Sequence, residues 1–339
     1  MGVRMSVPVI ALTGPLGAGK TTVLNHLLAA PGARVGVVIN DFGAINVDAG
    51  LVVGQVDEAA SIAGGCVCCM PDAGGLDEAL DTLTDPRLRL DAVIVEASGV
   101  AEPVALARLI RFSGADRARL GGAVEVIDAV EHERSVQAGL VAPARYAAAT
   151  LAVVNKLDLV PDAERAAREV ALGAMIREHN PAVEVVPAER GAIDPALVFD
   201  VAGEDDPLDQ LPISQLLREE LATEPAHTHA DSAGGVADGP VDPGALIDLL
   251  ENPPAGAYRI KGTVPVRTGR GQRIYTVHRV GRSVHVEKAP AGRAADGLVA
   301  IGLHLDAAAH VRIVEALRPA AAPSSEGMRR LERYQRLSR

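Results

Sequence analysis

The residues best suited to chemistry lie in a glycine-rich stretch near the start of the chain, GPLGAGKT at residues 14–21. This stretch matches the phosphate-binding pattern GxxxxGKS/T at every fixed position. An apolar run at Val7–Thr13 precedes it and a helix-like apolar stripe follows it, so backbone N–H groups would converge on one anion. Lys20 would reach the β- and γ-phosphates and the Thr21 hydroxyl would bind Mg²⁺, unless the stretch is a glycine-rich turn that matches by chance.

A second polar motif, NKLD at residues 155–158, follows an apolar run late in the chain. A carboxylate at Asp158 can accept hydrogen bonds from the ring N–H and the exocyclic amine of guanine, which adenine does not offer. We expect Lys156 to lie along the base and Asn155 to tie this loop to the phosphate loop. The motif therefore predicts GTP as the nucleotide; the alternative is a polar strand-to-helix turn in an ATPase.

A third motif, EASG at residues 96–99, ends another apolar run. Glu96 can hold Mg²⁺ directly or through water, and the Gly99 N–H can contact the γ-phosphate, so both join Lys20 as candidate catalytic residues. An ordinary turn at the end of a strand is the alternative. No glutamine stands out to orient the attacking water, so we expect intrinsic GTP hydrolysis to be slow.

The three cysteines, Cys66, Cys68 and Cys69, lie within four positions on a glycine-rich stretch. They cannot link distant parts of the fold by disulfides, which agrees with a reducing compartment. Three thiolates suit one soft ion such as Zn²⁺, with water, a substrate or Asp41 as fourth ligand. Burial as small core residues and redox chemistry are the alternatives. Asp41 could equally be a nucleotide-sensing switch residue or a simple cap.

The bulk properties limit the class of protein further. A chain of 339 residues suggests about two domains, and a net charge of −11 argues against nucleic-acid binding. No apolar stretch reaches the roughly 18 residues that span a bilayer. Met1–Pro8 lacks a signal-peptide core, so we expect no membrane contact and a cytoplasmic location. His227 and His229 could bind metal loosely, although a solvated tract explains them as well.

The apolar runs of the first 200 residues alternate with helix-like segments, which predicts an α/β fold of the P-loop NTPase type, with a doubly wound, mostly parallel sheet. The expected strands are Val7–Thr13, Arg34–Asn40, Asp91–Glu96, Ala123–Asp128, Leu151–Asn155 and Val183–Pro187, and the expected helices are Leu76–Leu83, Pro103–Phe112 and Ala163–Glu178.

The rest of the chain has a different pattern. Residues 1–200 would form the nucleotide-binding domain, 201–240 a flexible linker rich in Glu, Asp, Pro, His and Gly, and 241–325 a smaller α+β domain. Residues 326–339 would be a basic tail that frays. In the smaller domain we expect helices at Pro243–Leu250 and Ala307–Leu317, and strands at Ala257–Val266, Gln272–Val280, Ser283–Lys288 and Val299–Leu305.

The ordered blocks of the chain resemble the CobW-type family of P-loop GTPases, relatives of the urease and hydrogenase accessory GTPases. The blocks are GPLGAGKTT, NDFGAINVDAG, GGCVCC, EASGVAEP and NKLDL, over about residues 7–190, and PPAGAYRIKGTVPV resembles the family's C-terminal domain more loosely. Two residues depart from the family pattern. Pro15 stands where Phe is usual and removes one N–H, and Asp41 replaces a Glu that is one methylene longer.

The resemblance implies a metallochaperone driven by GTP binding and hydrolysis, which holds zinc, or in some branches cobalt, at the CxCC loop and transfers it to a client metalloprotein. By this resemblance, the transition-metal ligands are Cys66, Cys68 and Cys69, and the residues that bind Mg²⁺ are Thr21 and Glu96. Asn155, Lys156 and Asp158 become the guanine site, and the phosphate site takes in Gly14, Gly17, Ala18, Gly19, Lys20, Thr21 and Thr22. The oligomeric state stays open, a homodimer being one option.

Two other functions compete with this one. The first is a P-loop kinase or ATPase that acts on a small metabolite and has structural cysteines; the guanine motif at residues 155–158 argues against it. The second is a zinc buffer with a vestigial nucleotide site, against which the intact Lys20–Thr21 pair argues.

Overall fold

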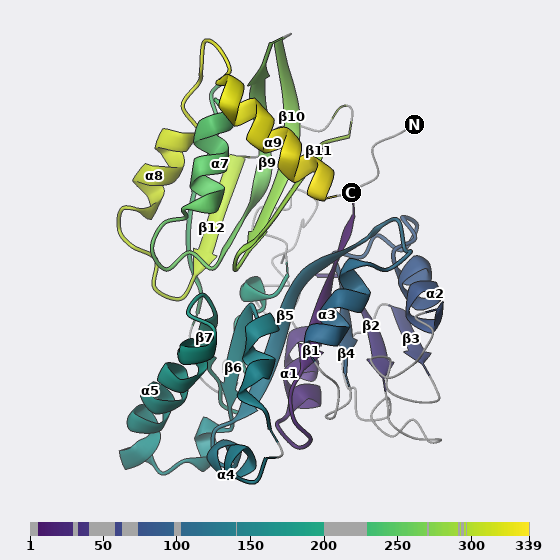
Figure 1. Cartoon of the computed structure of the whole chain (residues 1–339), viewed down its shortest axis with the longest axis vertical. Coiled ribbons are helices and arrows are strands. Elements are labelled where there is room, and N and C mark those ends of the chain that lie inside the picture. The colour runs from purple at the N-terminus through teal and green to yellow at the C-terminus, as the bar shows by residue number, and fades with distance from the viewer. Residues whose placement is uncertain are drawn as a thin grey trace, which may run out of the picture. The chain divides into compact units, whose positions relative to one another are not determined.

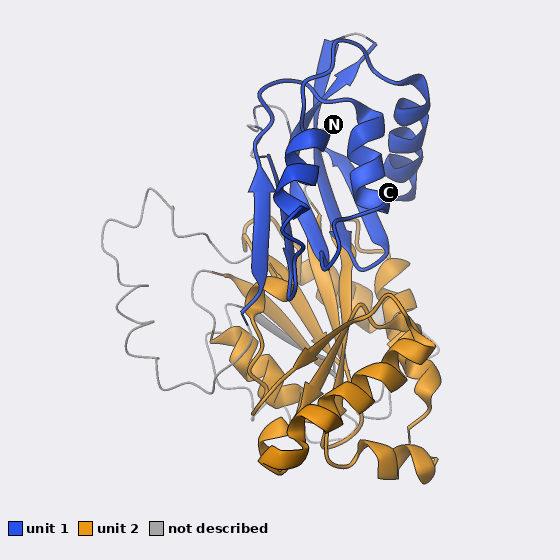
Figure 2. Cartoon of the chain, turned by 90° about the vertical axis from the view of Figure 1, so that its left-hand side faces the viewer, with its two compact units in different colours: residues 1–5, 229–339 blue, residues 6–228 orange. Residues whose placement is uncertain are grey.

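The computed structural model describes residues 6–29, 33–40, 58–62, 74–97, 103–139, 141–199, 229–269, 271–290, 292, 295 and 297–338. The chain divides into two compact units, residues 6–228 and residues 229–339 together with residues 1–5 (Figure 2). Each unit has its own sheet and its own hydrophobic core.

The described part of the first unit is built on a seven-stranded sheet in the order β3-β2-β4-β1-β5-β6-β7 (Figure 1). Every neighbouring pair is parallel. The strands are β1 (Val7–Thr13), β2 (Val35–Asn40), β3 (Glu58–Ile62), β4 (Ala92–Glu96), β5 (Ala118–Asp128), β6 (Leu151–Asn155) and β7 (Glu184–Pro187). The predicted doubly wound parallel sheet is confirmed, and all six strands expected from apolar runs are present.

Helices cover this sheet because its strands are apolar on both sides. On β1, Val9 and Ala11 join a core with side chains of α2 and α3, and the alternating residues Ile10 and Leu12 are buried as well. The helices are α1 (Lys20–Leu28), α2 (Gly74–Leu83), α3 (Pro103–Arg111), α4 (His132–Gln137) and α5 (Asp162–His179), and the 3-10 turns are η3 (Pro143–Ala148), η4 (Leu157–Leu159) and η5 (Pro195–Leu197).

The edge strand β3 was not among the predicted strands. Its sequence, EAASI, has a single β-branched aliphatic residue and no continuous apolar run. It is defined by parallel pairing with β2, from Gly36 opposite Glu58 to Asn40 opposite Ile62. Such tertiary pairing overrides local propensity at a sheet edge.

The second unit contains, in its described residues, a five-stranded antiparallel sheet in the order β11-β10-β9-β12-β8. Helices α7, α8 and α9 pack on one face of it (Figure 1), around a core that includes Leu250, Ile260, Val277, Ile313 and Leu331. The elements are β8 (Asp231–Gly235), α7 (Pro243–Glu251), β9 (Arg259–Thr268), β10 (Gly271–Val280), β11 (Ser283–Lys288), β12 (Gly297–Gly302), α8 (Ala309–Ala316) and α9 (Ser325–Leu337).

Two expectations for this part of the chain were wrong. Residues 231–235, inside the expected linker 201–240, form β8, because small residues there pair with Leu298–Gly302 of β12. The expected fraying tail 326–339 is largely α9. Ser324 caps this helix by accepting a hydrogen bond from the Gly327 N–H at 3.0 Å, Leu331 is buried, and Arg330 forms ion pairs with α7.

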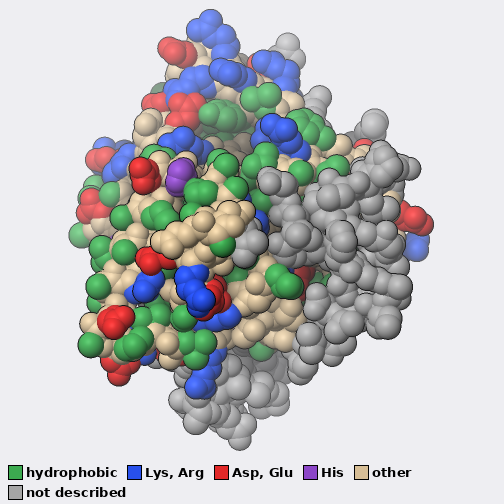
Figure 3. Space-filling model, turned by 60° about the horizontal axis from the view of Figure 1, so that its bottom comes forward, with side chains coloured by type: hydrophobic (Ala, Val, Ile, Leu, Met, Phe, Trp, Pro, Cys, Tyr) green, Lys and Arg blue, Asp and Glu red, His purple; other side chains and the backbone are tan. Residues whose placement is uncertain are grey.

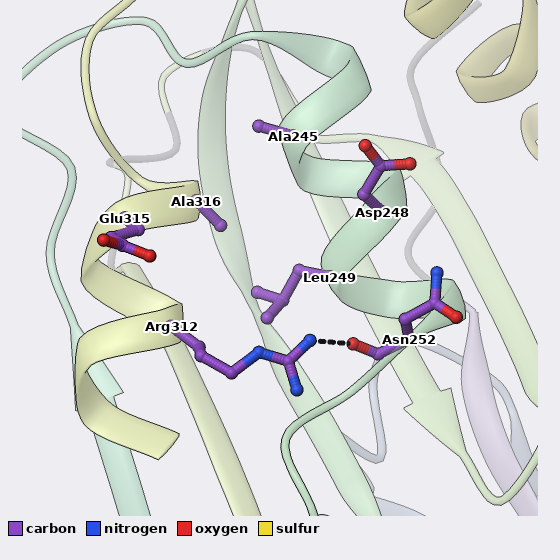
Figure 4. Close-up of a pocket in the computed structure, with 7 residues that line it drawn as sticks. All are labelled: Ala245, Asp248, Leu249, Asn252, Arg312, Glu315 and Ala316. Carbon is purple, nitrogen blue, oxygen red and sulfur yellow. Dashed lines mark hydrogen bonds between the residues drawn. The ribbon is translucent and has the colours of Figure 1, made fainter. Parts of the chain in front are cut away.

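A groove of 410 Å³ lies between α7 and α8 (Figure 4). Its apolar wall is formed by Leu249, Ala245 and Ala316, and Asp248 and Glu315 add acidic groups. The Arg312 guanidinium donates to the carbonyl of Asn252 at 2.6 Å and so ties α8 to the end of α7.

A buried ion pair lies beside the strand that leads into the phosphate loop. Glu125 of β5, only 1% exposed, accepts hydrogen bonds from the Arg145 Nε and from the hydroxyl of Thr13, both at 2.5 Å. Burial raises the pKa of Glu125 above its ordinary value, although Arg145 and Thr13 act in the opposite direction. This pair fixes the last residue of β1 against η3.

Replacing Arg145 with Ala should destabilise the protein by about 3–5 kcal/mol, because the buried Glu125 loses its partner. The exposed pair of Arg134 on α4 and Glu131, the residue before this helix, gives a matched control, since Arg134→Ala should lower the free energy of unfolding by less than about 1 kcal/mol. The folded-state pKa of Glu125 is raised and would be higher still without Arg145, so protonation should relieve the defect as the pH falls. Urea unfolding should show that Arg145→Ala loses less unfolding free energy, relative to wild type, at about pH 5 than at about pH 8. Equal losses for Arg145→Ala and Arg134→Ala would contradict the assignment.

Candidate functional site

The phosphate loop joins the end of β1 at Thr13 to the start of α1 at Lys20. Gly17 and Gly19 have φ angles of +78° and +97°, in the left-handed region that favours glycine. At Gly14 the restriction is space, because a Cβ there would lie 2.5 Å from the carbonyl oxygen of Val126 on β5. The glycines of the motif therefore allow the loop to turn tightly against its neighbouring strand.

Lys20 lies folded over the phosphate loop. It is 8% exposed, and its Nζ donates to the carbonyl of Gly14 at 3.1 Å and to that of Pro15 at 3.4 Å. The ammonium group is thus held directly above the turn of the loop, where a bound phosphate would meet it.

Thr21 and Glu96 meet at the carboxyl edge of the sheet. Glu96 ends β4, which pairs with β1 so that Leu12 lies opposite Glu96. The Thr21 hydroxyl donates to the Glu96 Oε1 at 2.9 Å, and the carboxyl is 3% exposed. A hydroxyl and a carboxylate are hard oxygen donors of the kind that Mg²⁺ prefers, so these two residues fit the ion.

Asn155 joins the motif at residues 155–158 to the phosphate loop. This side chain, 1% exposed at the end of β6, donates from Nδ2 to the carbonyl of Ala18 at 3.0 Å. Its Oδ1 accepts from the N–H of Gly191 at 2.8 Å. The first bond is the tie between the two loops that the sequence predicts, and the second adds a third loop, after β7.

The other two polar residues of this motif are also held in place. The Asp158 carboxylate accepts from the Arg190 N–H at 3.1 Å, and the Arg190 Nε lies 3.7 Å from its other oxygen. The Lys156 Nζ lies 2.6 Å from Asp128 Oδ2 at the end of β5. Both side chains are therefore held in defined positions by these contacts.

Sequence reasoning missed three of these partners, namely Gly191, Arg190 and Asp128. Gly191 has φ +77°, and a Cβ there would lie 2.8 Å from backbone atoms of Thr22 and Val23. The only local sequence signal for Gly191 was a glycine shortly after β7. The signal for Asp128 was also weak, since it is simply an acidic residue that ends a buried strand.

Several predicted site residues lie outside the described residues. They are Asp41, Cys66, Cys68, Cys69, Gly99 and His227. Within the described ranges, no group of three or more His, Cys, Asp or Glu side chains could hold a metal ion. Among those same residues, no helix is both long enough and apolar enough to cross a membrane.

Figure 3 brings forward the end of the molecule at which α4 lies in Figure 1. In the part of this face that the structure describes, acidic and basic side chains are interspersed with hydrophobic ones. Ion pairs at α4 agree with this mixture, since Arg134 pairs with Glu131 and Arg168 pairs with Glu133, both at 3.1 Å.

Three features define the class of P-loop nucleotide-binding proteins. They are a glycine loop between a parallel strand and a helix, a threonine–glutamate pair beside it, and a polar loop that is tied to the glycine loop through Asn155. Comparison with known families gives the particular branch. The family described as "CobW/HypB/UreG, nucleotide-binding domain" matches residues 8–186, and the chain belongs to this family. Residues 232–318 match the cobalamin synthesis protein cobW C-terminal domain.

Individual relatives differ in how much of the chain they match. The chain is 29% identical to the zinc chaperone YjiA of Escherichia coli (strain K12) over 206 residues, which are 58% of this chain and 62% of that protein. It is 27% identical to a zinc chaperone CobW of Sinorhizobium sp over 358 residues, 92% of this chain and 97% of the relative. The solved structure of Zn(II)-bound YjiA GTPase from E. coli aligns with a TM-score of 0.42 at 21% identity, covering 92% of this chain and 98% of its own.

Replacing Gly19 with Ala should weaken nucleotide binding about tenfold or more, because a buried hydrogen bond is lost. The new Cβ would lie 2.4 Å from the Asn155 Nδ2 and push this amide away from Ala18. Gly17→Ala is the matched control, since Gly17 also has positive φ but a Cβ there meets nothing within 4 Å. Fluorescent GDP titration should show the larger loss for Gly19→Ala; equal losses would mean that backbone strain, and not the Asn155 contact, decides affinity.

Proposed function

We propose that this protein is a GTP-binding and GTP-hydrolysing metallochaperone that carries a transition metal at its CxCC loop and passes it to a client metalloprotein. The observation that supports it best is the bridge made by Asn155, whose amide spans from Ala18 of the phosphate loop to Gly191. This bridge supports a shared site, because it ties the loop proposed for the guanine base to the loop proposed for the triphosphate.

The described residues would divide the work on the nucleotide. The N–H groups from Gly17 to Thr22, at the start of α1, would bind phosphate oxygens, and Lys20 would exchange its carbonyl partners for the β- and γ-phosphates. Thr21 and Glu96 would hold Mg²⁺, which neutralises phosphate charge when bound. A carboxyl that is 3% exposed and fixed by a hydroxyl is well placed for this role.

Base selection would fall to Asp158. Its carboxylate accepts hydrogen bonds and cannot donate one, so it pairs with the N–H and NH₂ edge of guanine and leaves adenine unmatched. If adenine were bound, the carboxylate oxygens of Asp158 would lack the hydrogen-bond donors that guanine supplies. GTP is therefore the nucleotide that this site would select.

The cargo would be zinc or a similar soft ion, such as cobalt. The zinc chaperones of E. coli and Sinorhizobium are relatives of this chain. Cys66, Cys68 and Cys69 supply thiolates in a segment between the strand before Asp41 and the strand that ends at Glu96. We infer that this segment responds to both ligands, that hydrolysis of GTP releases the ion to the client, and that this takes place in the cytoplasm.

Asp158→Asn should lower the affinity for GTP about 100-fold, because an amide cannot accept both guanine donors. The same amide can donate to the 2-oxo group of xanthine, so XTP should gain affinity while ATP stays weak. Competition of the three nucleotides against labelled GDP measures this. Asp162→Asn, at a side chain that is 92% exposed on α5, is the charge-matched control and should behave as wild type. Equal binding of GTP and ATP by the wild-type protein would exclude the proposed base selection.

Zinc affinity should differ about tenfold between the protein bound to a non-hydrolysable GTP analogue and the GDP-bound protein. Reciprocity requires zinc to shift the affinity for the GTP analogue by the same factor. Titration with metal analysis, on wild type and on the triple Cys66→Ser, Cys68→Ser, Cys69→Ser variant, tests both points. A triple variant that kept the zinc site would contradict the thiolate assignment, and equal affinities in the two nucleotide states would contradict the coupling.

A further inference from the structure

The lysine of the base-recognition loop is held by a carboxylate from the neighbouring strand. Asp128, the last residue of β5, lies opposite Asn155, the last residue of β6. The Ala129 N–H donates to the Asn155 carbonyl at 2.9 Å, so the two strand ends stay in register beyond the sheet. Lys156 follows directly, and its Nζ reaches Asp128 Oδ2 at 2.6 Å.

The two oxygens of Asp128 have separate tasks. Oδ1 accepts from the N–H groups of Val130 at 2.9 Å and Glu131 at 3.0 Å, which closes the turn that leads to α4. Oδ2 accepts from Lys156. Burial raises the pKa of this carboxyl, but the hydrogen bonds from Lys156, Glu131 and Val130 outweigh that effect and hold the pKa below its ordinary value of 3.8. Asp128 is therefore an anion at neutral pH.

Lys156 has an unusual backbone as well as a fixed head group. Its φ angle is +64°, in the left-handed region that non-glycine residues seldom adopt. The ion pair is partly shielded, with 30% of the lysine side chain and 14% of the aspartate side chain exposed. A lysine side chain has a flexible four-carbon stem, and its conformational freedom is lost when both the backbone and the ammonium group are held. Here the backbone fixes one end and Asp128 fixes the other.

We propose that Asp128 is a positioning residue for guanine recognition that acts through Lys156. By anchoring the ammonium group, it lays the apolar stem of Lys156 beside Asp158, as a preformed wall against which the base packs. Anchoring the stem before the base arrives lowers the entropic cost of binding. This inference rests on the proposed GTP function and adds a residue outside the NKLD motif to the base site.

Asp128→Asn separates the two tasks of this carboxylate. The amide oxygen can still accept from Val130 and Glu131, while the NH₂ group that replaces the second oxygen cannot accept from Lys156. We expect Asp128→Asn to weaken the binding of GTP and GDP about fivefold through faster dissociation, the size expected when one long side chain has to be ordered on binding. The rate of hydrolysis at saturating GTP and the thermal midpoint should stay close to wild type. Asp128→Ala loses both tasks and should also lower the thermal midpoint.

Two further measurements distinguish positioning from general support of the loop. Inorganic tripolyphosphate has no base, so its competition for the phosphate loop should be the same in Asp128→Asn and in wild type. In a Lys156→Ala background, Asp128→Asn should cause no additional loss of GTP affinity. A loss that persists without Lys156, or an equal loss of tripolyphosphate, would overturn the inference.

Nucleotide binding by wild type and by Asp128→Asn distinguishes a failure of this inference from a failure of the proposed function. If the wild-type protein binds ATP and no guanine nucleotide, both are wrong. If wild type binds GTP and Asp128→Asn binds it equally well, the GTP function stands and the role of Asp128 is refuted.

Discussion

The nucleotide site depends on one buried amide. Asn155 uses both of its polar atoms, the Nδ2 toward the phosphate loop and the Oδ1 toward the loop after β7. Because the residue is only 1% exposed, water could not take the place of either hydrogen-bond partner. Leaving either partner unsatisfied would cost the full penalty of a buried polar group. Three segments that are far apart in the sequence are thus held at fixed separation. Gly19 and Gly191 are glycines because the backbone must come this close.

The order of the strands makes this arrangement possible. In a parallel sheet all carboxyl ends lie at one edge, and β1 is flanked there by β4 on one side and β5 on the other. Glu96 therefore arrives beside Thr21, and Asp128 arrives beside Lys156, each from a neighbouring strand. The buried Glu125, one register position from the phosphate loop, steadies the same edge from within the sheet.

The parts of this site that the sequence predicted are those with local signals. The phosphate loop and the NKLD loop are short motifs next to apolar runs, and the contact of Asn155 with Ala18 followed from them. Asp128 and Gly191 were missed because their roles come from contacts between distant segments, strand pairing for Asp128 and loop packing against Asn155 and α1 for Gly191. The same reason explains β8 and α9. A Gly-rich strand needs its partner β12, and a helix with many arginines shows its buried side, at Leu331, only when α7 is present.

The position of Lys20 has a consequence for the rearrangement that polyphosphate binding would require. Its ammonium already lies against the carbonyl oxygens of Gly14 and Pro15, so an arriving polyphosphate finds a cation that is in place and partly desolvated. Binding of a polyphosphate would replace one set of oxygen partners of Lys20 by another. Because the ammonium group already faces oxygen atoms at this turn, the lysine side chain would need little rearrangement to exchange them for those of a polyphosphate.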